Sequence, residues 1–277
     1  MPFVWKRARR TAFLALTLFF LMLFPYGPLF PWSPVKPGYE HLALARADVY
    51  YPRGSQLDAE YRKLDLYIAE SEQFHQMKVS ARMCVVACND WAAFGRFNPQ
   101  YRNGREVGAV TLATGTVIYV SPKIAERGFD VGEFLRHELS HATINQNQSL
   151  MAAWRLMDVP WLVEGIAVAN GRQKSYYSRE EFLARALREK DLSLFIDPSR
   201  RDEVKGIFDM RYAYPTWRYF NEYLMARDRA AYQRYLQAVM KEPQEWRARF
   251  APEFGVSFET AVERFQSSLA VANPAAE

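Results

Sequence analysis

The pattern of hydrophobic and polar positions changes at about residue 130. Beyond this point, nearly every segment has apolar residues at the spacing of an α-helix, whereas the earlier part combines short apolar runs with one helical segment. The earlier part predicts, in order, a strand, a helix, a buried strand and a pair of strands, over 41–52, 58–76, 79–88 and 108–122. We therefore expect an α+β fold in which a small mixed sheet is followed by a mainly helical C-terminal half.

Local signals define several element ends. Asp58 is suited to cap the first helix, and the paired strands are expected to turn near residues 114–115. A capping box at 178–181 opens a later helix, and 213–240 predicts one long helix or two shorter ones. The stretches at 89–105, 145–158 and 173–177 are expected to be loops, and the first and last of them to shape a groove.

A membrane segment is expected at the N-terminus. Four basic residues within 6–10 precede an uncharged apolar run over 11–24, and no further charge appears before Lys36. Such a run suits a signal peptide, an anchor or a buried helix. The anchor is favoured because no small-residue cleavage pattern follows closely. The basic flank then stays on the cytoplasmic side, which predicts a single-pass protein of the inner (cytoplasmic) membrane with its remaining residues periplasmic or extracellular.

The charge balance excludes nucleic acid as an expected partner. The chain has 36 basic and 31 acidic residues, so its net charge is +5. Most of this excess lies within residues 6–10, and the rest of the chain has no concentrated basic stripe that would neutralise phosphates.

Two cysteines, Cys84 and Cys88, occur in the strand expected over 79–88. In a regular strand, residues four apart are separated by ~13 Å, too far for a disulfide. A bulge or turn within the segment would bring them closer, so the pairing stays open.

The motif HELSH places His137, Glu138 and His141 on the helix expected after Asp130. Residues four apart lie one turn apart on nearly the same side of a helix, so both imidazoles can reach one ion. Glu138 then lies where a carboxylate takes a proton from a zinc-activated water. The motif predicts a hydrolytic Zn2+ site. The plainer alternative is a polar helix face on which Glu138 pairs with Arg136 or another surface base.

A catalytic zinc ion usually has a third protein ligand. The residues just after His141 supply none, and the next acids are Asp158 and Glu164. Glu164 is favoured because it lies among apolar residues near the start of a helix opened by Pro160, where a carboxylate without a cation would be costly. The alternative role of Glu164 is an acid stabilised by the helix dipole.

HELSH at 137–141, followed by PWLVEGIA at 160–167, resembles the gluzincin metallopeptidases, in particular the peptidase MA-like domains that have a WLxEG second motif. The resemblance extends over about residues 45–270, and the two motifs are its specific part. It implies a zincin-like fold, Zn2+ bound by His137, His141 and Glu164, and Glu138 as general base. The segment at 108–113 lacks the acid with which aminopeptidases of this family bind a free amine, which favours an endopeptidase or a specificity that the motifs do not define.

The resemblance also implies a tyrosine whose hydroxyl stabilises the oxyanion. Tyr214 is the best match and Tyr212 the alternative, although either of these residues, in a chain with 16 tyrosines, would also suit ordinary aromatic packing. No acidic residue is an evident hydrogen-bond partner for the two histidines.

We therefore predict a membrane-anchored zinc metallopeptidase that hydrolyses peptide or protein substrates. The anchor is expected over 1–36 and the zincin-like domain over 37–272, divided into sheet and motif helix (37–146) and helical subdomain (147–272), before a tail at 273–277. The alternatives are a non-catalytic zinc-binding or scaffolding domain of the same fold, and a membrane-tethered helical domain without metal.

Overall fold

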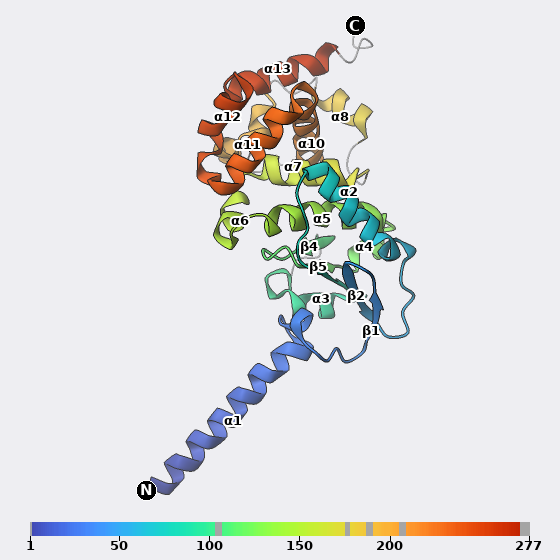
Figure 1. Ribbon diagram of the computed structural model, residues 1–277, viewed down its shortest axis with the longest axis vertical. Coiled ribbons are helices and arrows are strands. Elements are labelled where there is room, and N and C mark those ends of the chain that lie inside the picture. The colour runs from blue at the N-terminus through green and yellow to red at the C-terminus, as the bar shows by residue number, and fades with distance from the viewer. Residues whose placement is uncertain (1, 103–106, 175–177, 187–190, 205–208, 272–277) are drawn as a thin grey trace.

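The computed structural model describes residues 2–102, 107–174, 178–186, 191–204 and 209–271 (Figure 1). The tail expected at 273–277 lies outside these ranges. The described part is a mixed α+β structure with one five-stranded sheet. Its strands are β1 (Tyr39–Ala43), β2 (Ala47–Pro52), β3 (Met83–Ala87), β4 (Ala109–Thr111) and β5 (Val117–Val120).

The sheet has the order β1-β2-β3-β5-β4. β2, β3 and β5 are parallel, and β1 and β4 are antiparallel edge strands. The predicted strand pair at 108–122 is confirmed as β4 and β5. The buried strand predicted over 79–88 is confirmed in its second half, where β3 lies at the centre of the sheet.

Helices cover both faces of the sheet. One face packs against α2 (Leu64–His75) and α5 (Val131–Gln146), and the other against α3 (Trp91–Phe97) and η1 (Phe30–Trp32). Successive strand residues therefore serve different cores: Val85 joins the α2–α5 side and Val86 the α3 side. Burial on both faces explains why β3 and β5 are apolar throughout rather than alternating.

The prediction of a single strand over 41–52 is wrong, because this segment contributes to two strands, β1 and β2, joined by a tight turn. Asp65 of α2 accepts hydrogen bonds from the backbone N–H groups of Ala45 and Arg46, both at 2.9 Å. Arg46 then places its guanidinium on Glu72 of α2, at 3.0 and 2.7 Å. Side chains of α2 thus hold the turn closed.

Two further differences concern short helices. The groove loop expected over 89–105 contains α3 and η3 (Pro99–Tyr101), with 103–105 outside the described residues, and α4 (Lys123–Arg127) follows β5. Asp58 caps a helix as predicted, but the first turns form η2 (Ala59–Lys63) before α2 begins.

The C-terminal half is helical, as predicted, and has its own aromatic-rich core around Trp161. Two helices, not one, occupy 213–240, and the capping box at 178–181 forms in both directions. The loop expected over 145–158 contains a helix. The elements are α6 (Leu150–Leu156), α7 (Pro160–Gly171), α8 (Arg179–Ala186), α9 (Ser193–Ile196), η4 (Pro198–Val204), α10 (Met210–Arg227), α11 (Arg229–Lys241), η5 (Pro243–Glu245), α12 (Trp246–Phe254) and α13 (Phe258–Val271).

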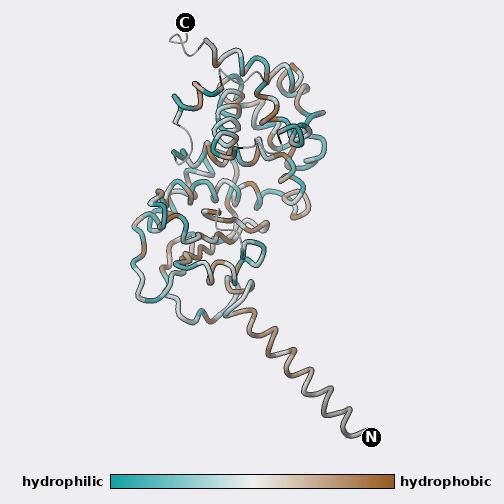
Figure 2. Tube along the Cα trace, turned by 180° about the vertical axis from the view of Figure 1, so that it is seen from behind, coloured by the Kyte–Doolittle hydropathy of each residue, from teal (hydrophilic) through white to brown (hydrophobic). Residues whose placement is uncertain are grey.

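The N-terminal segment forms α1 (Pro2–Tyr26), which projects away from the rest of the protein (Figure 1). Its apolar residues from Phe13 to Phe24 are mostly exposed, and Figure 2 shows the continuous hydrophobic colouring of this part. Of the helices in the described ranges, none has the combination of length and hydrophobicity needed to cross a membrane.

Cys84 and Cys88 are both free thiols. The bulge that would bring them together is absent from β3, whose pairing with its neighbours is regular through Cys84. Burial raises the pKa of the Cys84 thiol to about 12 and that of Cys88 further still, so both stay protonated at neutral pH.

Candidate metal centre

Three side chains of α5 and α7 converge on one point. The Nε2 atoms of His137 and His141 are 3.1 Å apart, and Oε2 of Glu164 lies 3.4 Å from the first and 3.7 Å from the second. Together they are a group of ligating side chains that can hold a metal ion. Asp158, the other acid considered, does not belong to this group.

The donor set fits zinc. Ligand distances of about 2.0–2.2 Å in a tetrahedral site correspond to donor separations of about 3.3–3.6 Å. The edges of the triangle formed by His137, His141 and Glu164, at 3.1, 3.4 and 3.7 Å, are close to these values. Two imidazoles and one carboxylate are a usual ligand set of catalytic zinc and leave a fourth position open. The side chain of Glu164 is 28% exposed, so the ligand triangle is not sealed from solvent.

Helix ends and helix contacts position the ligands. Asp130 caps α5 by accepting a hydrogen bond from Gly132 N at 2.7 Å, and Pro160 is the first residue of α7. The two helices meet closely at Gly171, where an added Cβ would lie 2.9 Å from the carbonyl oxygen of Glu133 and 3.3 Å from Cβ of His137. A larger residue at 171 would push α7 away from the helix that carries both histidines.

A buried polar network fixes α5 from behind. His75 of α2 bonds Ser140 through Nε2 at 2.8 Å, and Ser71 bonds Thr143 at 2.8 Å. Asn170 of α7 donates to the carbonyl oxygen of Arg136 at 2.8 Å. Burial lowers the pKa of His75 to about 3, so it is neutral at physiological pH. These bonds join α2, α5 and α7 where the ligands project, which restricts rotation of α5 about its axis.

The electrostatics of the three ligands favour a cation between them. Burial raises the pKa of Glu164, but His141 and His137 lower it by more, so the pKa of this carboxyl lies well below its usual range. Burial lowers the pKa of His141, and Glu164 more than compensates, so that pKa is raised. A metal ion bound between them would stabilise the ionised carboxylate and compete with protonation of His141.

Gln173 supplies the hydrogen bond that the sequence did not reveal. Its Oε1 lies 2.9 Å from Nδ1 of His137, and the side chain is buried. A carboxamide oxygen only accepts, so Nδ1 carries the proton and Nε2 presents its lone pair to the metal position. From the sequence, only acidic partners were considered. Gln173 lies 36 residues from His137, and no motif or spacing in the sequence connects the two.

The carboxylate of Glu138 is held by a residue of β4. Thr111 donates its hydroxyl to Oε2 of Glu138 at 2.7 Å and to its carbonyl oxygen at 2.9 Å. Arg136, the partner expected if this were an ordinary polar helix face, instead bonds Glu70 at 3.0 Å and lies 3.8 Å from the ring centre of Tyr67. The Glu138–Arg136 alternative is therefore wrong.

A cleft of about 830 Å3 opens beside the triangle. His137, Glu138 and Tyr214 line it, and the rings of His137 and Tyr214 are 6.4 Å apart. Tyr212 is fully buried in the C-terminal core, where its ring packs against Phe182. Of the two tyrosines considered, only Tyr214 is placed to meet a molecule in the cleft.

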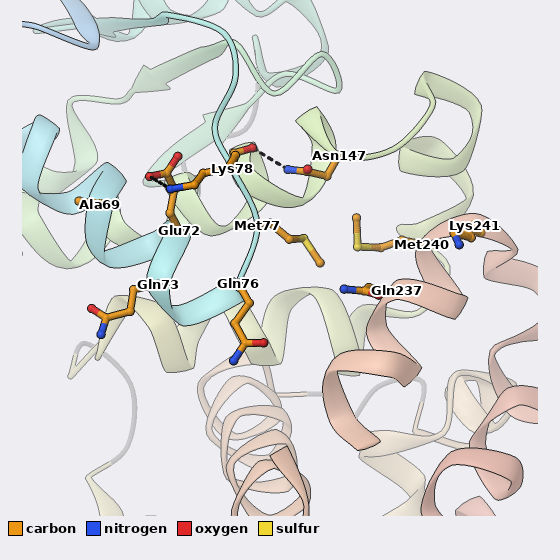
Figure 3. A pocket seen from close by; sticks show the side chains of 10 residues that line it. All are labelled: Ala69, Glu72, Gln73, Gln76, Met77, Lys78, Asn147, Gln237, Met240 and Lys241. Carbon is orange, nitrogen blue, oxygen red and sulfur yellow. Dashed lines mark hydrogen bonds and ion pairs between the residues drawn. The ribbon is translucent and has the colours of Figure 1, made fainter. Parts of the chain in front are cut away.

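A second and larger hollow, of about 930 Å3, lies elsewhere, between the end of α2 and α11 (Figure 3). Met77, two residues past the end of α2, faces Met240 of α11 across it, and carboxamides and lysines lie around them. Its carboxylate, Glu72, is already bonded to Arg46. None of the three converging ligands lines this hollow, so its size alone does not make it the functional site.

Neither a comparison with models of known protein families nor one with curated proteins finds a match to this chain. The residues singled out by the sequence nevertheless meet in space: His137, His141 and Glu164 form the triangle, and Glu138 and Tyr214 line the adjoining cleft. The possible role of the site therefore follows from these residues and their geometry.

Proposed function

We propose that this protein is a zinc metallopeptidase of the gluzincin type, with His137, His141 and Glu164 as metal ligands. The observation that carries the proposal is the donor triangle, whose edges suit tetrahedral zinc, beside a cleft that contains a carboxylate. A mixed sheet against the motif helix, and a third ligand from the helical half, are consistent with a zincin-like fold.

The proposed mechanism gives separate tasks to Glu138, Thr111 and Tyr214. When bound, zinc supplies Lewis-acid polarisation of a carbonyl group and of water. Glu138 accepts the proton of the attacking water and later passes it to the nitrogen of the leaving amine. Thr111 holds the carboxylate of Glu138 in place, and Tyr214 donates its hydroxyl hydrogen to the oxyanion of the tetrahedral intermediate.

The form of the cleft supports a peptide substrate. β4 is an edge strand, and its residue Ala109 lines the cleft together with the preceding Gly108. An extended peptide can add to such an edge through main-chain hydrogen bonds, which places a peptide carbonyl near the ligand triangle independently of its side chains.

Replacing Glu138 by Gln tests the mechanism. Because the amide cannot accept the proton, we expect peptide hydrolysis to fall by at least about 100-fold, while zinc stays bound. Glu245→Gln, the same change at an exposed position on η5, serves as control and should leave the rate unchanged. Cleavage at the parental rate by the Glu138 variant would show that another group acts as base.

The second candidate is a zinc-binding or scaffolding domain without turnover. Its support is limited to the ligand triangle, whereas the carboxylate and the tyrosine in the cleft have no task in a purely structural site. Zinc content of one ion per chain, together with no cleavage of any member of a broad peptide library, would favour it.

We also propose that the N-terminal segment, α1 together with the uncharged residues that follow it up to Lys36, anchors the protein in a membrane and leaves the residues after about 36 on the periplasmic or extracellular side. The exposed apolar side chains of 11–24 and the basic residues at 6–10 support this orientation. The full chain should stay with membranes after alkaline carbonate washing, and added protease should digest its domain from the outer side only. Release by the wash would contradict the attachment.

A further inference from the structure

The segment that connects α1 to β1 is built into the core of the domain. Phe30 of η1 is fully buried on the α3 side of the sheet. Its ring stacks on that of Phe97 of α3, with ring centres 4.4 Å apart, and lies 4.8 Å from the ring centre of Tyr39 at the start of β1. One aromatic side chain thus joins the connecting segment to both the sheet and α3, and the large apolar area that it buries resists its withdrawal.

Hydrogen bonds fix both ends of this segment. The first residues after α1 donate two backbone hydrogen bonds to the carbonyl oxygen of Leu23 in the last turn of α1, at 3.1 and 3.2 Å. At the other end, Lys36 donates its ammonium group to the carbonyl oxygens of Pro31 and Ser33, at 3.3 and 2.5 Å. Its Nζ also lies 4.3 Å from the ring centre of Tyr50 of β2, which is a cation–π contact.

The fixed segment joins α1 and the domain into one body. A flexible chain of the same ten residues, 27–36, would let the domain move over ~17 Å relative to the anchor. Here α1 leaves the domain from the layer that η1 and α3 form on one face of the sheet (Figure 1). The outer side of this layer therefore faces the direction in which α1 extends, which is the membrane side under the proposed attachment.

Exposed side chains of this layer suit a lipid boundary. Tyr26, Trp32 and Val35 are large hydrophobic residues that are 50%, 49% and 62% exposed. Tyr and Trp favour the boundary between water and lipid, because each has an apolar ring and a polar tip. On α3, the buried residues face the sheet and Arg96 is exposed, so its guanidinium is available to lipid phosphates.

We propose that the outer side of η1 and α3 rests on the phospholipid headgroups, with Trp32 at the lipid boundary and Arg96 on the phosphates. The partner is the bilayer that α1 enters, because the exposed apolar surface of α1 continues into Tyr26 and Trp32. The proposal rests on the proposed membrane attachment and adds to it a fixed orientation of the domain. The cleft beside the ligand triangle then keeps one position relative to the bilayer and meets its substrates there.

Position-specific fluorescence tests the contact. In the full chain with Cys84→Ala and Cys88→Ala, a single cysteine is introduced by Val35→Cys, by Ala92→Cys on α3 or, as control, by Arg264→Cys on α13, all at exposed positions. α13 lies at the end of the molecule opposite α1 (Figure 1). Each cysteine is labelled with the fluorophore NBD, and the protein is reconstituted in vesicles of phosphatidylcholine and phosphatidylglycerol, with or without a nitroxide on the lipid headgroup.

The nitroxide lipid should quench NBD at positions 35 and 92, because both face the headgroups, and leave NBD at position 264 unquenched. Phe30→Ala, which removes the buried ring, should reduce the quenching at 92 and keep that at 35, whereas Phe30→Leu should retain both. In the protein with native Phe30, quenching at 35 without quenching at 92, or equal quenching at all three positions, would overturn the proposal and leave the membrane attachment standing. Recovery of the protein free of vesicles after flotation, with no quenching at any position, would contradict the attachment and the proposal together.

Discussion

Replacing Gly165 by Ala tests the close contact between α7 and α10 that supports the ligand Glu164. A Cβ at this position would lie 2.4 Å from Nδ2 of Asn221 and 2.6 Å from the carbonyl oxygen of Trp217. Asn221 cannot move aside freely, because its Nδ2 donates to the carbonyl oxygens of Trp161 at 2.7 Å and Trp217 at 2.8 Å.

The magnitude follows from three contributions. Overpacking in a core costs about 1–3 kcal/mol, and the loss of one buried hydrogen bond of Asn221 costs about 1 kcal/mol. The higher helix propensity of Ala compared with Gly offsets about 1 kcal/mol of this loss. The net loss in the free energy of unfolding is about 2 kcal/mol, which lowers Tm by roughly 4–8 °C for a chain of this size.

Thermal unfolding followed by circular dichroism measures this change. The double variant Gly165→Ala/Asn221→Ala serves as control, because shortening Asn221 removes part of the overlap and the two costs should be less than additive. A Gly165→Ala protein as stable as the parent, or more stable, would show that α7 and α10 do not approach each other this closely.

Two other predictions concern single side chains. Gln173→Met removes the acceptor for Nδ1 of His137 and should weaken zinc binding about 10- to 100-fold, measured by competition with a chelating dye. Gln237→Met, in the other hollow, is the control and should leave zinc affinity unchanged. Equal zinc affinities of the parent and Gln173→Met would refute the positioning role. The bonds from Arg46 lower the pKa of Glu72 from 4.5 to about 2, so this carboxylate stabilises the fold above about pH 4.5, and its contribution is lost as pH falls toward 2. Urea unfolding should thus show Glu72→Gln to be about 1–3 kcal/mol less stable than the parent at pH 7, with most of this difference lost by about pH 2.5. A difference that does not change with pH would contradict the ion pair.

Local patterns predicted the parts of the site that depend on one helix. The spacing of His137 and His141 determines that both face one point, and Pro160 marks the start of the helix that carries Glu164. The strand pair at 108–122 was likewise predictable, because its period of two and its turn are encoded within 15 residues.

Features that depend on distant residues were not predictable. The turn that divides 41–52 is held by Asp65, and Gln173 reaches His137 only because α7 ends beside α5. Neither contact leaves a period or a motif in the sequence. The choice of Tyr214 over Tyr212 required burial as well, since their spacing from Glu164 is nearly the same and only the packed core distinguishes them.

Metal content is the most direct test of the central claim, which is that three side chains of α5 and α7 bind one zinc ion. Protein purified without chelators and supplied with Zn2+ is analysed by elemental mass spectrometry, together with His141→Ala, Glu164→Ala and Glu138→Gln. We predict about one zinc per chain for the parent and for Glu138→Gln, and strongly reduced zinc for the two ligand variants. No zinc in the parent, or equal zinc in the parent and the ligand variants, would contradict the proposed centre.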